Sequence, residues 1–174
     1  MAMAKNEAKQ VGEFAFVISR VFDAPRELVW KAWTEPERLL KWWGPRGAQI
    51  LSTKVDLRVG GIFHYLLKSA EGLEIWGKFV YREISPPEKL VFINSFSDAA
   101  GGTTRAPFFD GKWPLQILST ITLAEEGKKT KVTVNWVPYS ATEIERKTFE
   151  DGANSMQQGW SGTLDNLTDY LAAL

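Results

Sequence analysis

The chain has 174 residues, of which 44% are hydrophobic and 24% charged. This length and balance are typical of one globular domain and exclude a fibrous or largely disordered chain. Lys plus Arg and Asp plus Glu number 21 each, so no net charge attracts the protein to nucleic acid or to anionic lipid. We therefore expect a single domain over residues 13–174, after a flexible tail at 1–12, and neither nucleic acid nor a membrane as a partner.

Cysteine is absent from the sequence, which excludes disulfides, thiolate catalysis and cysteine metal sites. No run of about 18 apolar residues occurs, and the polar first twelve residues lack the hydrophobic region of a signal peptide. We therefore expect a cytoplasmic protein. Aromatic residues are abundant, at 13%, and rigid rings of this kind either fill a core or line a cavity.

Two short helices are predicted after a first strand. Apolar residues alternate with small or polar ones over 14–22, which predicts a strand. Asp23 to Pro25 interrupts this pattern, and the helical spacing after Pro25 predicts a helix over 26–34. Thr34 to Glu37 begins a second helix in the same way, and Gly44-Pro45 ends it.

From residue 50 onward the pattern changes to a period of two, with turn residues such as Gly60-Gly61 and Pro86-Pro87 between the apolar runs. This pattern predicts an antiparallel meander. The predicted strands span 49–58, 61–68, 74–84, 89–97, 113–124 and 129–137. One longer connection, 98–112, contains Phe108-Phe109, and a loop of this length in a compact domain is more often functional than idle.

The last segment, 142–174, returns to a helical period and is long enough for the largest helix. Its apolar residues recur at i, i+4, i+7 and i+11 and form one stripe: Trp160, Leu164, Leu167 and Leu171. Gly152 and Gly159 mark either a break in this helix or a close approach to the sheet. Only this helix has the length and the stripe to cover one face of an antiparallel sheet, so the element order predicts an α+β fold.

Several motifs spread along the chain resemble a known family. They are Phe22-Asp23-Ala24-Pro25, Val29-Trp30-Lys31-Ala32-Trp33-Thr34-Glu35-Pro36-Glu37, Trp42-Trp43-Gly44-Pro45, Val55-Asp56-Leu57-Arg58-Val59-Gly60-Gly61, Pro86-Pro87-Glu88-Lys89-Leu90 and Gly159-Trp160-Ser161-Gly162-Thr163-Leu164. Together they resemble the START-like, or SRPBCC, superfamily, in the branch named for the activator of heat-shock protein 90 ATPase. The resemblance implies the helix-grip fold, in which a curved antiparallel sheet of about seven strands wraps around a long C-terminal helix, with two short helices after strand 1. It does not imply one activity, because related domains include lipid carriers, cyclases, hormone binders and co-chaperone modules.

The helix-grip fold implies a cavity between the sheet and the long helix, and its candidate wall comes from three regions. These are the inner sheet face, the 98–112 connection and the first half of the helix. The candidate ligand-binding residues are Trp43, Phe63, Tyr65, Ile75, Phe79, Tyr81, Phe92, Asn94, Phe108, Phe109, Leu115, Ile117, Trp136, Met156, Gln157 and Trp160. Gln157 is expected to orient a ligand, and Phe108 or Phe109 to form a lid beside Trp42-Trp43-Gly44-Pro45.

Motifs for catalysis or for metal and nucleotide binding are absent from the sequence. His64 is the only histidine, and its strand parity directs it away from the inner face. Neither a nucleophile elbow nor a phosphate-binding glycine motif occurs. We therefore expect no metal, no cofactor and no catalytic residue.

The first functional hypothesis is a non-enzymatic protein that binds a small, largely hydrophobic molecule. One alternative is a cyclase or dehydratase that uses Tyr65, Tyr81, Asn94 or Gln157 in the same cavity, where desolvation shifts pKa values. The other is a co-chaperone-like module that binds a protein through its outer sheet face or through Trp42-Trp43. Neither the ligand nor the oligomeric state follows from the sequence.

Overall fold

The computed structural model describes residues 14–174, so the expected tail at 1–12 lies outside the described residues. The strands are β1 (Phe16–Phe22), β2 (Gln49–Val55), β3 (Ile62–Lys68), β4 (Glu74–Ser85), β5 (Lys89–Ser97), β6 (Thr103–Thr104), β7 (Ile117–Glu126) and β8 (Lys129–Pro138). The helices are α2 (Arg26–Thr34), α3 (Pro36–Trp42), α4 (Glu143–Asp151) and α5 (Ala153–Ala172), with a 3₁₀ turn at Phe109–Gly111. Within 14–174 no helix is both long and apolar enough to cross a membrane.

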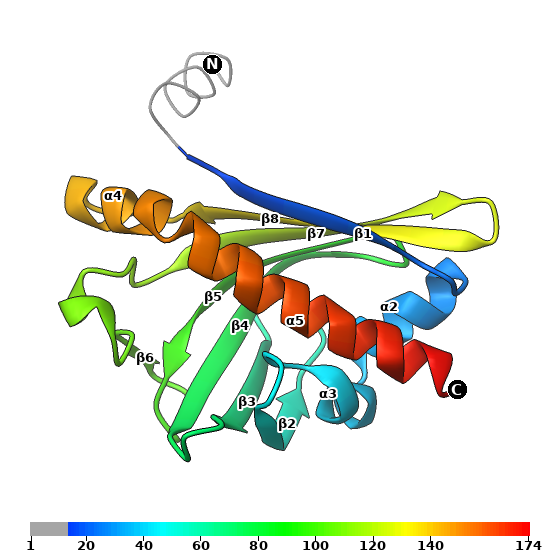
Figure 1. Ribbon diagram of the computed structural model, residues 1–174, viewed down its shortest axis with the longest axis horizontal. Helices are drawn as coiled ribbons and strands as arrows, with labels where there is room; N and C mark the ends of the chain where they lie inside the picture. Colours follow the sequence, from blue (N-terminus) through cyan, green and yellow to red (C-terminus); the bar gives the residue numbers. More distant parts are fainter. Residues whose placement is uncertain (1–13) are drawn as a thin grey trace.

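The strands form one antiparallel sheet in the order β1-β8-β7-β5-β4-β3-β2, and the two-residue β6 pairs with β5. The sheet curves around α5, which crosses it diagonally, while α2 and α3 lie near the C-terminal end of α5 (Figure 1). This architecture confirms the predicted helix-grip fold. It also places α4 and the β5–β7 connection near the opposite end of α5 (Figure 1).

Cross-strand register decides which side chains face α5. Phe63, Phe79, Asn94 and Ile117 lie opposite one another on β3, β4, β5 and β7. Because side chains alternate between the two faces of a strand, this row and its second neighbours form the inner face. The inner face is therefore mainly apolar and aromatic, as parity predicted.

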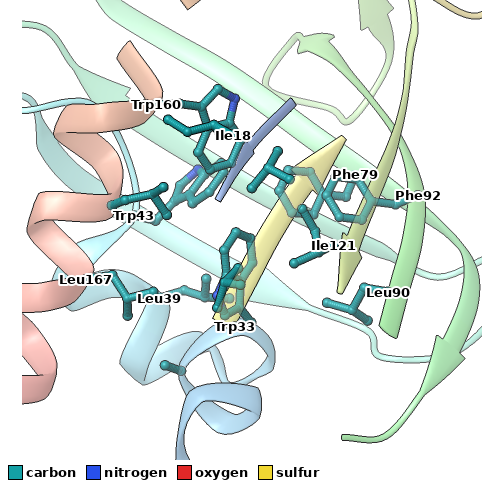
Figure 2. Packing of buried hydrophobic residues seen from close by; sticks show 14 of the residues in the cluster. Ile18, Trp33, Leu39, Trp43, Phe79, Leu90, Phe92, Ile121, Trp160 and Leu167 are labelled. Atoms are coloured by element: carbon teal, nitrogen blue, oxygen red, sulfur yellow. The ribbon is translucent and has the colours of Figure 1, made fainter. Parts of the chain in front are cut away.

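A cluster of tryptophans joins the short helices to α5. Trp33 on α2 lies 5.0 Å from Trp42, 6.1 Å from Trp43 and 6.2 Å from Trp160 between ring centres. Figure 2 shows Trp33, Trp43 and Trp160 close together in this core. Trp42 is fully buried and donates its indole N–H to the Ala32 carbonyl at 2.9 Å. Both members of the Trp42-Trp43 pair are thus buried.

Three predicted boundaries differ from the structure. The strand expected over 49–58 ends at Val55, because the chain turns back through the hydrogen bonds Gly61 N–H to Arg58 O and Asp56 N–H to Ile62 O. The strand expected over 113–124 begins at Ile117, since Pro114 has no N–H for a sheet hydrogen bond. The long helix is broken at Gly152 into α4 and α5.

The start of α4 explains why that helix is separate from α5. Thr142 and Glu145 form a capping box, in which the Thr142 hydroxyl accepts from the Glu145 N–H and the Glu145 carboxylate accepts from the Thr142 N–H. Such a box stabilises the first turn of a helix through contacts within that turn alone. Gly152, with φ −86° and ψ 11°, then leaves the helical conformation between the two helices.

Candidate functional site

A cavity of about 360 Å³ lies between the inner sheet face, the first half of α5, the β5–β7 connection and the segment after α3. This volume is at the lower end of the range of small-molecule sites. Eleven of the predicted residues line it: Trp43, Tyr65, Ile75, Phe79, Asn94, Phe108, Phe109, Ile117, Trp136, Met156 and Trp160. Their role in ligand binding stays a prediction.

Three predicted aromatic residues do not line the cavity because they lie deeper in the core. Phe63 is fully buried and packs edge-on against Phe79 at 4.9 Å between ring centres. Phe92 stacks on Phe79 at 3.8 Å, so Phe79 separates it from the cavity. Tyr81 is buried beside Phe92 and forms no hydrogen bond with residues 14–174 through its hydroxyl.

Gln157 and Leu115 also lie outside the cavity wall. The cavity-facing residues of α5 are Ser155, Met156, Gly159, Trp160 and Thr163. Gln157 projects from another side of the helix and is exposed, so the expectation that it orients a ligand is wrong. Leu115 is half-buried in the segment before β7, where strand parity does not apply.

Ten lining residues were absent from the predicted set: Gly44, Pro45, Leu67, Ser95, Phe96, Trp113, Pro114, Ser155, Gly159 and Thr163. Gly44 and Pro45 belong to the segment that was predicted to lie beside the lid, and some of the others carry a periodic signal. Phe96 follows Asn94 by two residues on β5, and Ser155, Gly159 and Thr163 recur every four residues on α5. Trp113 and Pro114 have no such signal, because an irregular connection brings them to the cavity.

Tyr65 lies flat across Gly77, its partner on the neighbouring strand. A Cβ at Gly77 would come within 2.3 Å of the Tyr65 hydroxyl oxygen, so only glycine leaves room for this ring. Burial raises the pKa of Tyr65 to about 12, and the nearby indole N–H of Trp43 partly offsets this increase. That N–H makes no hydrogen bond of standard geometry. Tyr65 is therefore a neutral hydroxyl in the cavity wall at physiological pH.

We expect the raised pKa of Tyr65 to appear in the pH dependence of stability. An unfolded tyrosine ionises near pH 10, whereas folded Tyr65 ionises at about pH 12. The folded state therefore holds this proton more tightly than the unfolded state does. The resulting contribution of Tyr65 to the free energy of unfolding is fully present below pH 10 and is lost as the pH rises towards 12. Urea unfolding between pH 9 and 11.5 should show a shallower fall in unfolding free energy for Tyr65→Phe than for the wild type. Equal slopes would contradict the burial of this hydroxyl; Tyr81, whose pKa burial also raises, contributes to the fall in both proteins.

Asn94, on β5, is a second polar side chain in the cavity wall. The Ser119 hydroxyl, which is fully buried, donates to the Asn94 side-chain carbonyl. Within residues 14–174 the Asn94 amide nitrogen makes no hydrogen bond. Ser119 thus holds the amide in one orientation, with its nitrogen free to donate.

The mouth of the cavity is aromatic. Phe108 and Phe109 line the cavity yet are 44% and 39% exposed. Phe108 packs edge-on against Phe96 at 5.4 Å, and Phe109 stacks on Trp113 at 4.8 Å. Both rings therefore lie where the cavity meets solvent.

An ion pair ties this mouth to α4. Arg105 donates to the Glu145 carboxylate at 2.5 Å and to the Trp113 carbonyl at 3.3 Å. Burial raises the pKa of Glu145, but hydrogen bonds from the Thr142 backbone and Arg105 outweigh it and hold the pKa below its usual value. The carboxylate is therefore ionised at neutral pH and holds the β5–β7 connection against the capping box.

His64 lies on the outer face, as its parity predicted. Its ring stacks on Trp76 at 4.7 Å, and its Nε2 atom lies 3.0 Å from the Asp98 carbonyl oxygen and 3.2 Å from the Ser97 hydroxyl. In the part of the chain that the structure describes, no three histidine, aspartate or glutamate side chains gather as metal ligands. His64 is thus a local contact of the β5–β6 turn, remote from the cavity.

Solved structures similar to this chain share the fold over nearly its whole length. A Nitrosomonas europaea protein is 25% identical, with a TM-score of 0.73 over 93% of this chain and 96% of its own. An Arthrobacter aurescens protein is 23% identical, with a TM-score of 0.74 over 94% and 89%. The AHSA1 protein of Silicibacter pomeroyi is 17% identical, with a TM-score of 0.65 over 92% and 99%.

The comparison with protein families covers most of the chain. No curated protein matches the sequence. The profile of the family described as "Activator of Hsp90 ATPase homolog 1-like protein" matches residues 23–172. The fold and this match support a ligand-binding or interaction module in general, and the chain belongs to the Activator of Hsp90 ATPase homolog 1-like family of START-like proteins.

Proposed function

We propose that this protein binds a small, largely hydrophobic molecule in the cavity between α5 and the sheet. The observation that carries the proposal is the cavity wall, which is built mainly from apolar and aromatic side chains with a few polar groups, including Tyr65 and Asn94. Pockets of this composition are typical of small-molecule sites. A packed core without function would have no reason to leave about 360 Å³ unfilled.

Filling the cavity from α5 tests the proposal directly. Gly159 lines the cavity, and a Cβ at this position would have no neighbouring atom within 4 Å. We expect Gly159→Leu to weaken binding of a hydrophobic fluorescent probe, Nile red, by at least about tenfold, because the leucine occupies the site. The same change should raise the unfolding free energy by roughly 0.5–1 kcal/mol, since glycine is unfavourable within a helix.

The matched control is Gln157→Leu, which adds a leucine to the exposed side of the same helix. This variant should bind Nile red as the wild type does, with binding followed by probe emission and stability by urea unfolding. Unchanged affinity in Gly159→Leu, or wild-type protein that is folded but does not bind Nile red, would refute the cavity as a binding site.

The remaining functional expectations stay predictions. Tyr65 and Asn94 lie in the cavity wall, as a cyclase or dehydratase would need, whereas Tyr81 and Gln157 do not. The family name refers to activation of the Hsp90 ATPase, and a protein partner of that kind is an alternative for this chain. The lid role of Phe108 and Phe109 and the cytoplasmic location are likewise predictions.

A further inference from the structure

We infer that the cavity selects an uncharged, flat aromatic molecule with a hydrogen-bond acceptor oxygen, and that the amide nitrogen of Asn94 binds this oxygen. The inference rests on the proposed binding function and adds the chemical class of the ligand. Three properties of the cavity wall carry it: its charge, its aromatic rings and its unpartnered hydrogen-bond donors, which include the Asn94 amide.

The wall carries no ionised side chain. No Lys, Arg, His, Asp or Glu is among the described residues that line the cavity. Tyr65 is its most acidic group, and it is neutral at physiological pH. A carboxylate or an amine placed here would lose its hydration without gaining an opposite charge. The ligand is therefore uncharged, which argues against free fatty acids and other organic anions.

The wall is also unusually rich in rings, since nine of its 21 residues are aromatic. Most neighbouring rings of the wall meet edge to face, for example Trp43 against Phe79 at 88° and Trp136 against Trp160 at 84°, whereas Phe109 stacks on Trp113. Such edge-to-face contacts leave ring faces and edges available to a further ring, and aromatic pairs in this geometry are favourable beyond their buried area. A flat aromatic ligand continues this arrangement, whereas a saturated ligand of the same size does not.

The polar atoms of the cavity wall favour a ligand that accepts a hydrogen bond. The Asn94 side-chain carbonyl is occupied by the Ser119 hydroxyl, and the Thr163 hydroxyl donates to the Gly159 carbonyl. The amide nitrogen of Asn94 has no such partner within residues 14–174, and neither have the indole N–H groups of Trp43 and Trp136. Tyr65 on β3 extends over Gly77 on β4, and it lines the same cavity as Asn94 on β5. A ligand oxygen beside Asn94 satisfies the free amide.

Four probes of similar size test the inference. They are 2-acetylnaphthalene, 2-isopropenylnaphthalene, in which CH₂ replaces the carbonyl oxygen, 2-naphthoate, and the saturated decalin ketone. Dissociation constants are measured at pH 7 by isothermal titration calorimetry. On the wild type, the naphthoate should bind at least about a hundredfold more weakly than the aromatic ketone, because it is ionised. The decalin ketone should bind about fivefold more weakly, because it lacks ring contacts.

The role of Asn94 is tested by the ratio of alkene to ketone dissociation constants. This ratio should fall by about tenfold in Asn94→Leu, because the ketone oxygen loses its donor while the alkene loses nothing. Ser119→Ala, which releases the amide, should lower the ratio by about threefold and leave alkene binding unchanged. Unchanged alkene affinity shows that each variant is folded. If Ser119 had a purely structural role, Ser119→Ala would change the alkene affinity rather than the ratio.

Several outcomes would overturn the inference. Naphthoate binding as tightly as the ketone would exclude the neutral ligand, and equal affinity of the decalin ketone would exclude aromatic selection. An alkene-to-ketone ratio that stays within about twofold in both variants would exclude Asn94 as the anchor. In each case the alkene still binds the wild type, so the proposed function survives. Failure of all four probes would overturn both the inference and the proposed function.

Discussion

Trp33→Ala is expected to lower the free energy of unfolding by about 3–5 kcal/mol, the usual cost of removing a large buried aromatic side chain. Trp33 is 1% exposed and contacts Trp42, Trp43 and Trp160. These contacts join α2, α3 and α5, so the void left by alanine cannot be closed by moving one element alone. Urea unfolding followed by far-ultraviolet circular dichroism measures the effect.

Two control variants separate packing from other causes. The indole N–H of Trp33 makes no hydrogen bond in the described part of the chain, so Trp33→Phe should cost clearly less than Trp33→Ala. Leu40→Ala on α3, at a position 40% exposed, should change stability by less than about 1 kcal/mol. A loss below about 1.5 kcal/mol for Trp33→Ala would show that the tryptophan cluster does not hold the helices to α5.

Gly77→Ala is expected to destabilise the protein by about 1–3 kcal/mol and to weaken binding of Nile red in the cavity. The new Cβ would lie 2.3 Å from the Tyr65 hydroxyl oxygen and 2.4 Å from the ring carbon that carries it. Tyr65 must therefore leave its place on the cavity wall, and its ring then takes up space that a ligand would use. Urea unfolding and Nile red titration measure the two effects.

A double-mutant cycle shows whether Tyr65 is the cause. In a Tyr65→Ala background the added methyl group of Gly77→Ala no longer meets the tyrosine ring. There the substitution should be neutral or slightly stabilising, because alanine is less costly than glycine within a strand. The same destabilisation in both backgrounds would place the clash elsewhere and contradict the close packing of these residues.

Periodicity was sufficient to predict most of this fold because each signal depends on local geometry. Alternation along the strands placed Phe79 on the inner face and His64 on the outer face, and both assignments are confirmed. In the predicted helical stripe Trp160, Leu164 and Leu167 are likewise buried, and Leu171 is half-buried. Gly152 and Gly159 were each predicted to mark either a break or a close approach to the sheet, and the helix breaks at Gly152 but continues through Gly159.

The site was less predictable, because the depth of each inner-face residue decides whether it lines the cavity. Phe63 and Phe79 share a face, yet only Phe79 reaches the cavity. Gln157 and Met156 are neighbours on one helix, but the rotation of α5 about its axis buries Met156 and exposes Gln157. The alternation of residues along a strand or helix does not predict how deeply a side chain lies or how a helix is rotated about its axis.

Length, charge balance and the alternation of apolar residues therefore determined an α+β fold whose sheet is covered on one face by a C-terminal helix. They also determined that this face is aromatic. Only the tertiary structure decided that Tyr65 lies across Gly77, that Ser119 orients Asn94, and that the segment around Trp113 lines the cavity. The physical reason is that these contacts join residues from different strands and connections, whose positions depend on sheet curvature rather than on local sequence.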